Sequence, residues 1–408
     1  MLLLPLSRRK FIEYTAAAVA VPLYPAFMSC GNAPVSSGKA YLRSVRKILS
    51  TVINKEKTSF SEAANLCADT IIGRKHCFLF TGFPAQPGYL DESTPGLPGN
   101  LINLRSQAMA ETLSKSDTVL VTDSGEITET ARKLGVSILN ITPLSGELVT
   151  IDSSELYINS HLPHPDGIVS HPDYPFPILP GYGLIRTVLV TALAGEIYRR
   201  SGGIGLAGNA APKDAFGFIE AVIERMRRLD EQFEVIHRAG ALAADKLLTG
   251  GRFMVYDSRE AMKSEFSRIS GIPVFARTIT REHILNGSLK NGDVLLFGSL
   301  SSNDIADLNL IREIKSAAGT DAVFSLCPHD ETGGYRLFKE STIALDNLSP
   351  EKDGIMALDN DNGTKHFLHT GGIVNIALLW VLIGEVTDIL LSRGEPPCYL
   401  KESEKVRK

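Results

Sequence analysis

Short apolar runs alternate with longer amphipathic stretches along most of this chain. Leu42–Ile72 carries apolar side chains at three- and four-residue spacing, which predicts a helix. Compact apolar runs then predict four buried strands, at Cys77–Thr81, Thr118–Thr122, Val136–Ile141 and Leu156–Ile158. Further helices are predicted over Leu104–Leu113, Ile127–Leu134 and Leu184–Arg199. Strands that alternate with helices in this way indicate a parallel sheet covered on both faces.

The second half of the chain has the same order of patterns. A helical stretch at Phe216–Leu248 precedes strands predicted at Phe253–Tyr256, Val294–Phe297, Ala322–Leu326 and Ile343–Leu345. A helix is expected near Ala261–Ile269, after the first of these strands. Ile373–Leu391 closes this half as a helix that is apolar almost all round, so Trp380 at its middle is predicted to be buried.

The sequence also repeats itself. Leu66-Cys-Ala-Asp69 returns in the second half as Leu242-Ala-Ala-Asp245, and Ile158–Ile168 returns as Leu345–Ile355. Gly183 returns as Gly372. The offset between the copies grows slightly along the chain, as insertions between fixed elements would produce. A period this long indicates duplicated domains.

We therefore predict two three-layer α/β/α domains with parallel sheets, packed against each other as an intrachain pseudo-dimer. They should cover residues 42–205 and 216–395, with linkers at 31–41 and 206–215 and a tail at 396–408. A chain of 408 residues with 44% apolar composition is long enough to bury two such cores.

Charge and cysteine content narrow the possible partners. The net charge is -4 and the basic residues do not cluster, which argues against a nucleic-acid partner. The five cysteines include no pair at metal-ligand spacing, and Cys67, Cys77 and Cys327 sit in apolar contexts that predict burial as small hydrophobic side chains. No cofactor and no metal are expected.

The segment Met1–Cys30 has the features of a targeting signal. Arg8 and Arg9 precede Lys10-Phe11-Ile12 and an Ala/Val-rich stretch, which resembles a twin-arginine export signal. An irregular basic start to a cytoplasmic protein is the alternative. Export would put the protein in the periplasm or at the cell envelope, with the export machinery as a partner. Cys30 partly matches a lipoprotein cleavage site, so it is a possible membrane anchor.

Hydroxyl side chains follow the second predicted strand of each half. Thr122, Ser124, Gly125 and Thr128 lie at this point in the first half. Their counterparts in the second half are Ser299, Ser301 and Ser302. Hydroxyls and free backbone N–H groups at a helix start can hold a phosphate, and they can equally cap the helix. The pattern leaves both interpretations open.

These loops resemble a known family. A strand, Ser-x-Ser-Gly or a variant of it, and a helix are similar to the phosphosugar-binding loop of sugar isomerase (SIS) domains. Asp293–Ser302, the two Leu-x-Ala-Asp segments and the glycine-rich entry to the last helix extend the likeness over most of the chain. The resemblance implies two SIS-like domains in one chain and a small carbohydrate derivative as ligand.

The chain also departs from that family. Thr122 stands at the family's first Ser, and Asp123 places a negative charge beside any phosphate. The glycine-rich loop after the first strand is reduced to Thr81–Pro84 in the first half and has no Gly in the second. There, Arg259 is a possible compensating positive charge.

Catalytic residues are harder to assign. Aldose–ketose isomerisation needs a base and an acid, and Glu265, His164 and His369 are the candidates; a solvated helical Glu and solvated loop histidines are the alternatives. Three hypotheses follow. The chain is an exported carbohydrate-derivative binding protein, a phosphosugar isomerase of the cell envelope, or a scaffold without ligand. Binding is preferred because the glycine loops are degraded.

Overall fold

A computed structural model describes the chain from residue 35 to residue 399, with gaps. The described residues are 35–80, 101–104, 106–122, 125–142, 154–163, 167–201, 215–258, 262, 265–266, 272–318, 322–329, 336–350, 354, 356–360 and 363–399, with the backbone alone for 317–318, 356–360 and 363–367. The predicted export segment with Arg8, Arg9 and Cys30 lies outside them, as do Ser124, His164 and Arg259. Residues Ser36–Lys408 form one compact unit.

The first half contains a five-stranded parallel sheet of order β2-β1-β3-β4-β5. Its strands are β1 (Cys77–Phe80), β2 (Ile102–Asn103), β3 (Thr118–Val121), β4 (Ser137–Thr142) and β5 (Leu156–Asn159). Every residue of the central strand β3 is buried, as expected for a strand covered on both faces.

The second half repeats this sheet as β9-β8-β10-β11-β12, again with all pairs parallel. Its strands are β8 (Phe253–Asp257), β9 (Ala276–Thr278), β10 (Val294–Gly298), β11 (Ala322–Cys327) and β12 (Ile343–Asp346). The two parallel sheets confirm the predicted fold class. The edge strands β2 and β9 were not predicted, because such short runs carry no periodicity.

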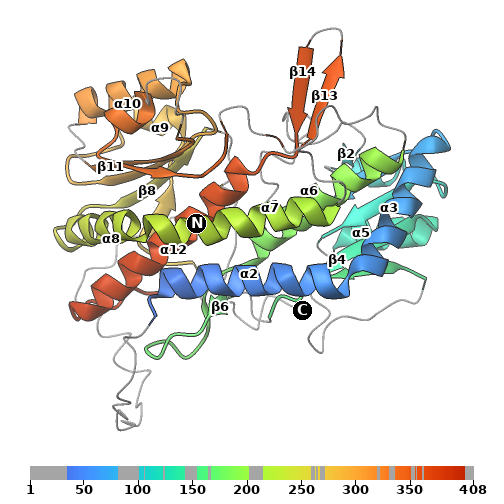
Figure 1. Ribbon diagram of the computed structural model, residues 1–408, viewed down its shortest axis with the longest axis horizontal. Helices are drawn as coiled ribbons and strands as arrows, with labels where there is room; N and C mark the ends of the chain where they lie inside the picture. The colour runs from blue at the N-terminus through green and yellow to red at the C-terminus, as the bar shows by residue number, and fades with distance from the viewer. Residues whose placement is uncertain are drawn as a thin grey trace. The chain divides into compact units, whose positions relative to one another are not determined.

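Helices lie on both sides of each sheet (Figure 1). The outer helices are α4 (Gln107–Ala110) and α5 (Glu126–Leu134) in the first half, and α9 (Arg281–Leu285), α10 (Ile305–Ala318) and α11 (Arg336–Glu340) in the second. The inner helices are α3 (Lys57–Ile72), α6 (Tyr182–Arg200), α8 (Phe233–Leu248) and α12 (Gly371–Ser392). Each outer face has its own apolar cluster, whereas one continuous cluster joins the inner faces of both sheets.

Two long predicted helices are each divided in the structure. Leu42–Ile72 contains α2 (Ser37–Lys55) and α3, which meet at Glu56. Phe216–Leu248 contains α7 (Ala215–Arg228), a short 3-10 segment, η2 (Leu229–Gln232), and α8. The Glu56 carboxylate bonds to His161 Nε2 at 2.8 Å, which ties the break to the segment after β5.

The predicted linker 31–41 is partly wrong, because α2 begins at Ser37. The Ser36 side chain accepts a hydrogen bond from the Lys39 backbone N–H and caps this helix. Leu42 was predicted as the start because the helix was recognised by its apolar residues. Ser37 and Gly38 are not apolar and do not contribute to that pattern, although both are buried.

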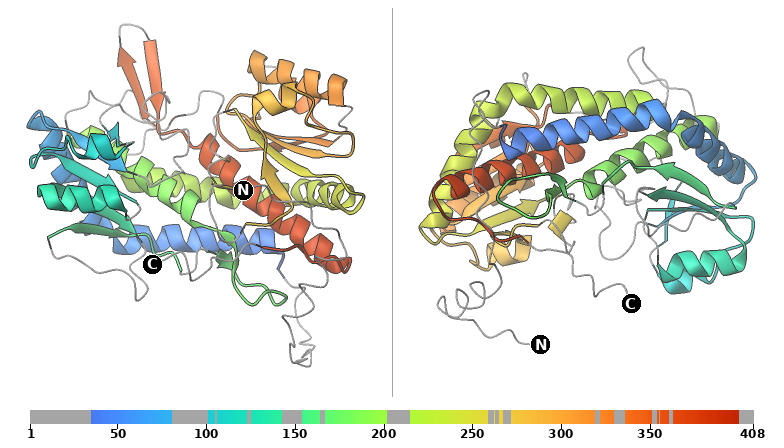
Figure 2. Two further views of the ribbon diagram at one scale, coloured as in Figure 1. Left: turned by 180° about the vertical axis from the view of Figure 1, so that it is seen from behind. Right: turned by 90° about the horizontal axis from the view of Figure 1, so that it is seen from below.

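The first helix of each half packs on the last helix of the other half. Helix α2 lies along α12 and α7, whereas α7 lies along α6 and α2 (Figures 1 and 2). The Ser37 backbone N–H and hydroxyl both donate to the Asp388 carboxylate, each at 2.6 Å. Gly38 and Gly384 let the two backbones touch there, since a Cβ on Gly384 would lie 2.8 Å from Gly38 N. The two halves are therefore interlocked.

Helix α12 forms the centre of the shared core. Trp380 is fully buried, as predicted. Among the described residues, α12 is the one helix long and apolar enough to cross a membrane, and 89% of its most apolar window is buried inside the protein. A long apolar helix that is mostly buried is typical of the core of a folded protein, so its length and composition are weak evidence for a membrane span.

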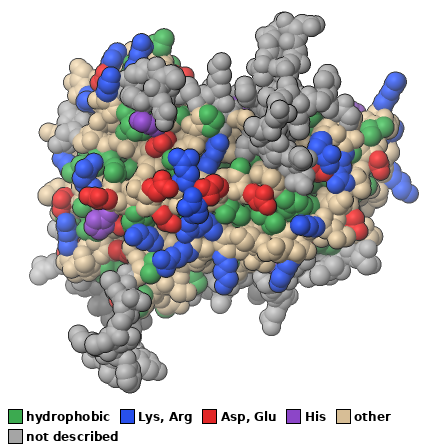
Figure 3. Space-filling model, viewed as in Figure 1, with side chains coloured by type: hydrophobic (Ala, Val, Ile, Leu, Met, Phe, Trp, Pro, Cys, Tyr) green, Lys and Arg blue, Asp and Glu red, His purple; other side chains and the backbone are tan. Residues whose placement is uncertain are grey.

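Two short antiparallel pairs complete the described elements, and the surface charge is mixed. β6 (Gly167–Val169) pairs with β7 (Ile178–Pro180), and β13 (Met356–Asn360) pairs with β14 (Gly363–Phe367) as a projecting hairpin (Figure 1). Acidic and basic side chains are interspersed on the face shown in Figure 3. Nucleic acid is usually bound by a surface of one sign.

Candidate functional site

Two buried hydroxyls lie at the carboxyl ends of strands in the first sheet. Thr122 directly follows β3 and is 2% exposed; Ser160 directly follows β5 and is 1% exposed. Neither Thr122 Oγ1 nor Ser160 Oγ has a hydrogen-bond partner among the residues that the structure describes. A buried hydroxyl without a partner costs about 1–3 kcal/mol, so such atoms mark places where a ligand or water would be stabilised.

A buried arginine lies close to Thr122. Tyr182, the first residue of α6, donates its hydroxyl to the Thr122 carbonyl oxygen. One turn further along α6, the Arg186 guanidinium carbon lies over the Tyr182 ring, 5.2 Å from its centre. Arg186 is only 3% exposed. The side chain of Tyr182 therefore connects this guanidinium to the end of β3.

Sequence reasoning did not identify Ser160 or Arg186 as site residues. A signal for Arg186 was present, because a cation inside the apolar run Leu184–Ile197 is rarely buried without a function or a partner. Ser160 gave no such signal, since a lone serine after a strand is common in loops.

The predicted loop at the start of α5 is only partly described. Gly125 is the N-cap residue of α5 in an extended conformation and gives no side-chain cap, and Thr128 in the first turn is 1% exposed. Ser124 lies outside the described residues. Glu126 and Glu129 occupy the first turn of this helix, so its dipole is already partly compensated by negative charge.

In the second half, the predicted serines are bonded within their own loop. The Ser299 hydroxyl lies 2.6 Å from Asp307 Oδ2 and 2.8 Å from the Ser301 carbonyl oxygen. Ser301 Oγ accepts from the Asn303 backbone N–H, and Ser302 Oγ accepts from the Asn303 side-chain amide.

Helix α10 does not use these serines as its cap. Asp304 Oδ1 accepts from the backbone N–H groups of Ala306 and Asp307, at 2.8 and 3.0 Å. An aspartate in this position satisfies the first free donors of the helix. The serine loop and the helix cap are thus separate features.

Two hydrogen-bonded asparagines lie at the carboxyl ends of the strands in the second sheet. Asn375 Oδ1 accepts from Asn347 Nδ2 at 3.0 Å, and Asn375 Nδ2 donates to the Ser299 carbonyl oxygen at 3.3 Å. Asn347 and Asn375 are fully buried. By the offsets of the repeated segments beside them, Asn347 corresponds to Ser160 and Asn375 corresponds to Arg186.

The pairing of the strands gives a more exact alignment of the two halves at the loops after β3 and β10. Cys77 on β1 pairs with Thr118 on β3, and Phe253 on β8 pairs with Val294 on β10. The sequence offset from β1 to β8 is therefore the same as the offset from β3 to β10. By this register Gly298 corresponds to Thr122. Ser299 therefore matches the residue after Thr122, one position from where the sequence comparison placed it.

Glu265 is buried between the halves and is not solvated. It is 1% exposed, and its Oε2 accepts from the Trp380 indole Nε1 at 3.0 Å. A Cβ placed on Gly183 would lie 1.8 Å from Glu265 Oε1, so the carboxylate lies against the first turn of α6. A negative charge at a helix N-terminus is stabilising.

The histidines do not form one cluster. His369 is half-buried and directly precedes Thr370, the N-cap residue of α12. His161 bonds to Glu56, and His171 Nε2 lies 3.5 Å from Asp388 Oδ1. His164 lies outside the described residues. Within the described part of the chain, no group of three or more His, Cys, Asp or Glu side chains is arranged to hold a metal.

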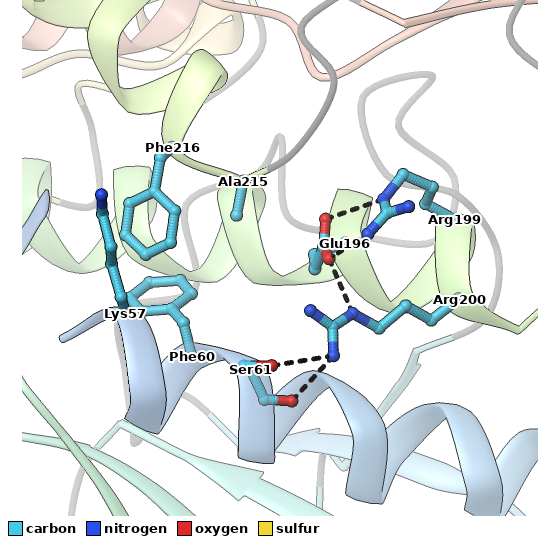
Figure 4. A pocket seen from close by; sticks show the side chains of 8 residues that line it. All are labelled: Lys57, Phe60, Ser61, Glu196, Arg199, Arg200, Ala215 and Phe216. Carbon is cyan, nitrogen blue, oxygen red and sulfur yellow. Dashed lines mark hydrogen bonds and ion pairs between the residues drawn. The ribbon is translucent and has the colours of Figure 1, made fainter.

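A small cavity of about 120 Å³ lies at the other end of α6 (Figure 4). Phe60 and Phe216 line one side of it, with ring centres 5.3 Å apart. On the other side Glu196 accepts from Arg199 and Arg200, each at 2.6 Å. Burial alone would raise the pKa of Glu196, but these arginines hold it below its ordinary value. The cavity's charges thus compensate one another, and it lies roughly 15 Å along the helix from Arg186.

Comparison with known proteins identifies the fold. No protein-family model matches the chain, and no curated protein matches it. Among solved structures, a candidate phosphosugar isomerase from Clostridium difficile 630 aligns with a TM-score of 0.56 at 13% identity, covering 89% of this chain and 96% of that one. The C-terminal domain of glucosamine-fructose-6-phosphate aminotransferase from Francisella tularensis gives 0.54 at 10% identity, covering 90% and 99%.

A candidate sugar-binding protein from Salmonella typhimurium gives a TM-score of 0.51 at 10% identity, covering 85% of this chain and 98% of that one. At these identities the likeness concerns the fold alone. The chain therefore has the duplicated α/β/α fold with parallel sheets that its sequence predicts, and it shares this fold with the three proteins above.

Proposed function

We propose that this chain is an exported SIS-type protein that binds a sugar phosphate or another carbohydrate derivative. The ligand would lie at the carboxyl ends of β3–β5, where parallel α/β sheets commonly bind ligands. The observation that carries the proposal is the pair of buried hydroxyls, Thr122 Oγ1 and Ser160 Oγ, which lack partners in the described structure. The buried Arg186 is linked to the Thr122 end of β3 through Tyr182. The names of the structural neighbours point to the same class of ligand.

Binding is proposed in preference to isomerisation because of the position of Glu265. Its carboxylate accepts from Trp380 and lies against Gly183 in the interior between the halves. A base that moves a substrate proton needs hydrogen-bond reach of that proton. The contacts described for Glu265 are structural ones, so they give no support to a catalytic role.

Ligand binding is tested by thermal shift and calorimetry on the full chain. Fructose 6-phosphate, glucosamine 6-phosphate, free fructose and inorganic phosphate serve as probes. A ligand that binds only the folded state stabilises it by about 2.7 kcal/mol at one hundred times its Kd, so the melting temperature should rise with concentration. Absence of a shift and of binding heat with all four probes would contradict the proposal.

Export is tested separately with a reporter fused after residue 30. Transport should depend on Arg8 and Arg9, because paired arginines are the feature that defines this type of signal. Unchanged transport of a variant with Lys at both positions would show that the export interpretation is wrong. Mass spectrometry of membrane fractions would detect a lipid on Cys30 if that residue is an anchor.

A further inference from the structure

We infer that the two halves have diverged so that each chain binds one anionic ligand, in the first half, with Arg186 as the residue that holds its negative group. This inference rests on the proposed function and adds three points to it: the number of sites, the charge of the ligand and the residue that recognises it. The two halves carry different residues at the same structural position.

In the second half, hydrogen bonds between protein groups occupy the carboxyl ends of β10 and β12. Asn375 on α12 bridges the ends of β10 and β12, bonding to the Ser299 carbonyl oxygen and to Asn347. The Ser299 hydroxyl is in turn engaged with Asp307. A ligand that entered here would have to replace hydrogen bonds that are already made, which removes most of the gain from binding.

In the first half the corresponding residues have different chemistry. Arg186 replaces the bridging asparagine on α6, and Ser160 replaces the second asparagine. Thr122 and Ser160 flank β4, so their Cα atoms are separated by two strand spacings, roughly 10 Å. Neither hydroxyl oxygen has a partner in the described structure. Asn347, the counterpart of Ser160, is hydrogen-bonded to Asn375, and Gly298, the counterpart of Thr122, has no side chain. One small sugar derivative spans this distance.

Arg186 supplies the positive charge for a ligand at this site. Its guanidinium is stacked on Tyr182, whose hydroxyl bonds to the Thr122 carbonyl, so it is held near the end of β3. A planar guanidinium binds phosphate or carboxylate through two parallel hydrogen bonds. The first turn of α5 already carries Glu126 and Glu129, and the start of α6 already carries Glu265. The anionic group is therefore expected at Arg186 and not at either helix start.

Calorimetry with fructose 6-phosphate and free fructose tests this on the full chain. The wild-type chain should bind one fructose 6-phosphate. Arg186→Met, which keeps an unbranched apolar stem but removes the guanidinium, should weaken that binding roughly 10- to 100-fold, the loss expected for a hydrogen bond to a charged group. Arg186→Lys should recover part of the affinity, and binding of free fructose should not respond to Arg186→Met. Ser301→Ala, in the second half, is the matched control and should bind like wild type.

A second variant guards against a folding defect, because Arg186 is buried and stacks on Tyr182, so that its replacement also changes packing. Thr122→Val removes one buried hydroxyl without changing shape, and it should also weaken fructose 6-phosphate binding. Two ligands per chain, or full affinity in folded Arg186→Met or in Thr122→Val, would overturn the inference and leave the proposed function standing. No binding of any of the four probes named above by the wild-type chain would overturn both.

Discussion

The tight crossing of α2 and α12 predicts that adding one methyl group at Gly384 destabilises the protein. In an exposed helix Gly→Ala stabilises by up to about 1 kcal/mol. At Gly384 the new Cβ would lie 2.8 Å from Gly38 N and 3.0 Å from Ser37 C. Ordinary contacts begin near 3.4 Å, so the two backbones would have to separate by roughly half an ångström or more.

That separation strains the contacts that dock α2. The Ser37 N–H and hydroxyl each bond to Asp388 at 2.6 Å, so the start of α2 cannot shift without lengthening both hydrogen bonds. Overpacking of this kind costs about 1–3 kcal/mol, and the gain in helix propensity offsets part of it. We expect a net loss of about 1–2 kcal/mol and, for a folded unit of this size, a melting temperature lower by about 1–3 °C.

Circular dichroism during thermal and urea unfolding measures the change. Gly73→Ala is the control, because Gly73 ends α3 with a helix-like φ of -70° and its nearest contacts lie within its own helix. It should stay within about 0.5 kcal/mol of wild type. Hydrogen exchange should also become faster in Ser37–Lys55 of Gly384→Ala. Wild-type stability and exchange in that variant would refute the close crossing of α2 and α12.

Three further predictions concern buried polar groups. Thr191 Oγ1 is buried without a partner in the described structure, whereas Thr387 Oγ1 bonds to Ile383 O and Tyr399 OH. Thr191→Val should therefore raise the melting temperature, and Thr387→Val should lower it. Burial alone would raise the pKa of Asp293, but hydrogen bonds from Arg252 hold it below its ordinary value. Its stabilisation is therefore complete above about pH 4 and is lost as the pH falls through the lowered pKa, a slope that should flatten in acid denaturation of Asp293→Asn. Glu265→Ala should cost about 1–3 kcal/mol by leaving the Trp380 N–H unpaired, whereas Glu265→Gln should unfold near the wild-type temperature.

The elements that sequence could predict are those whose own residues carry the signal. β3 and β10 are continuous apolar runs, and each appeared within a residue or two of its predicted bounds. The break at Glu56 was missed because the helices on both sides keep the same spacing of apolar residues. That break is fixed by a hydrogen bond to His161, which lies far along the chain beyond β5, so no local pattern contains it.

For the candidate site, the sequence predicts the strand ends and Thr122 but not Ser160 or Arg186. The strand ends were expected to hold the ligand, since parallel sheets place their carboxyl ends together. Arg186 and Ser160 were not predicted, because a sequence repeat is recognised by residues that are identical or similar in both copies. Their counterparts, Asn375 and Asn347, are different residue types. Glu265 was a candidate base with a solvated helical Glu as the alternative, and the structure buries it between the two halves.

The exchange of first helices also determines when the chain can finish folding. The Ser37–Asp388 contact joins residues 351 positions apart, and the other long partner of α2 is α7, which belongs to the second half. During synthesis the amino-terminal helix is made first, but its docking surface is not complete until α12 has emerged. Such a long-range contact forms late and slows folding. A product that stops before residue 371 would lack α12 and would leave exposed the part of the apolar side of α2 that packs on that helix.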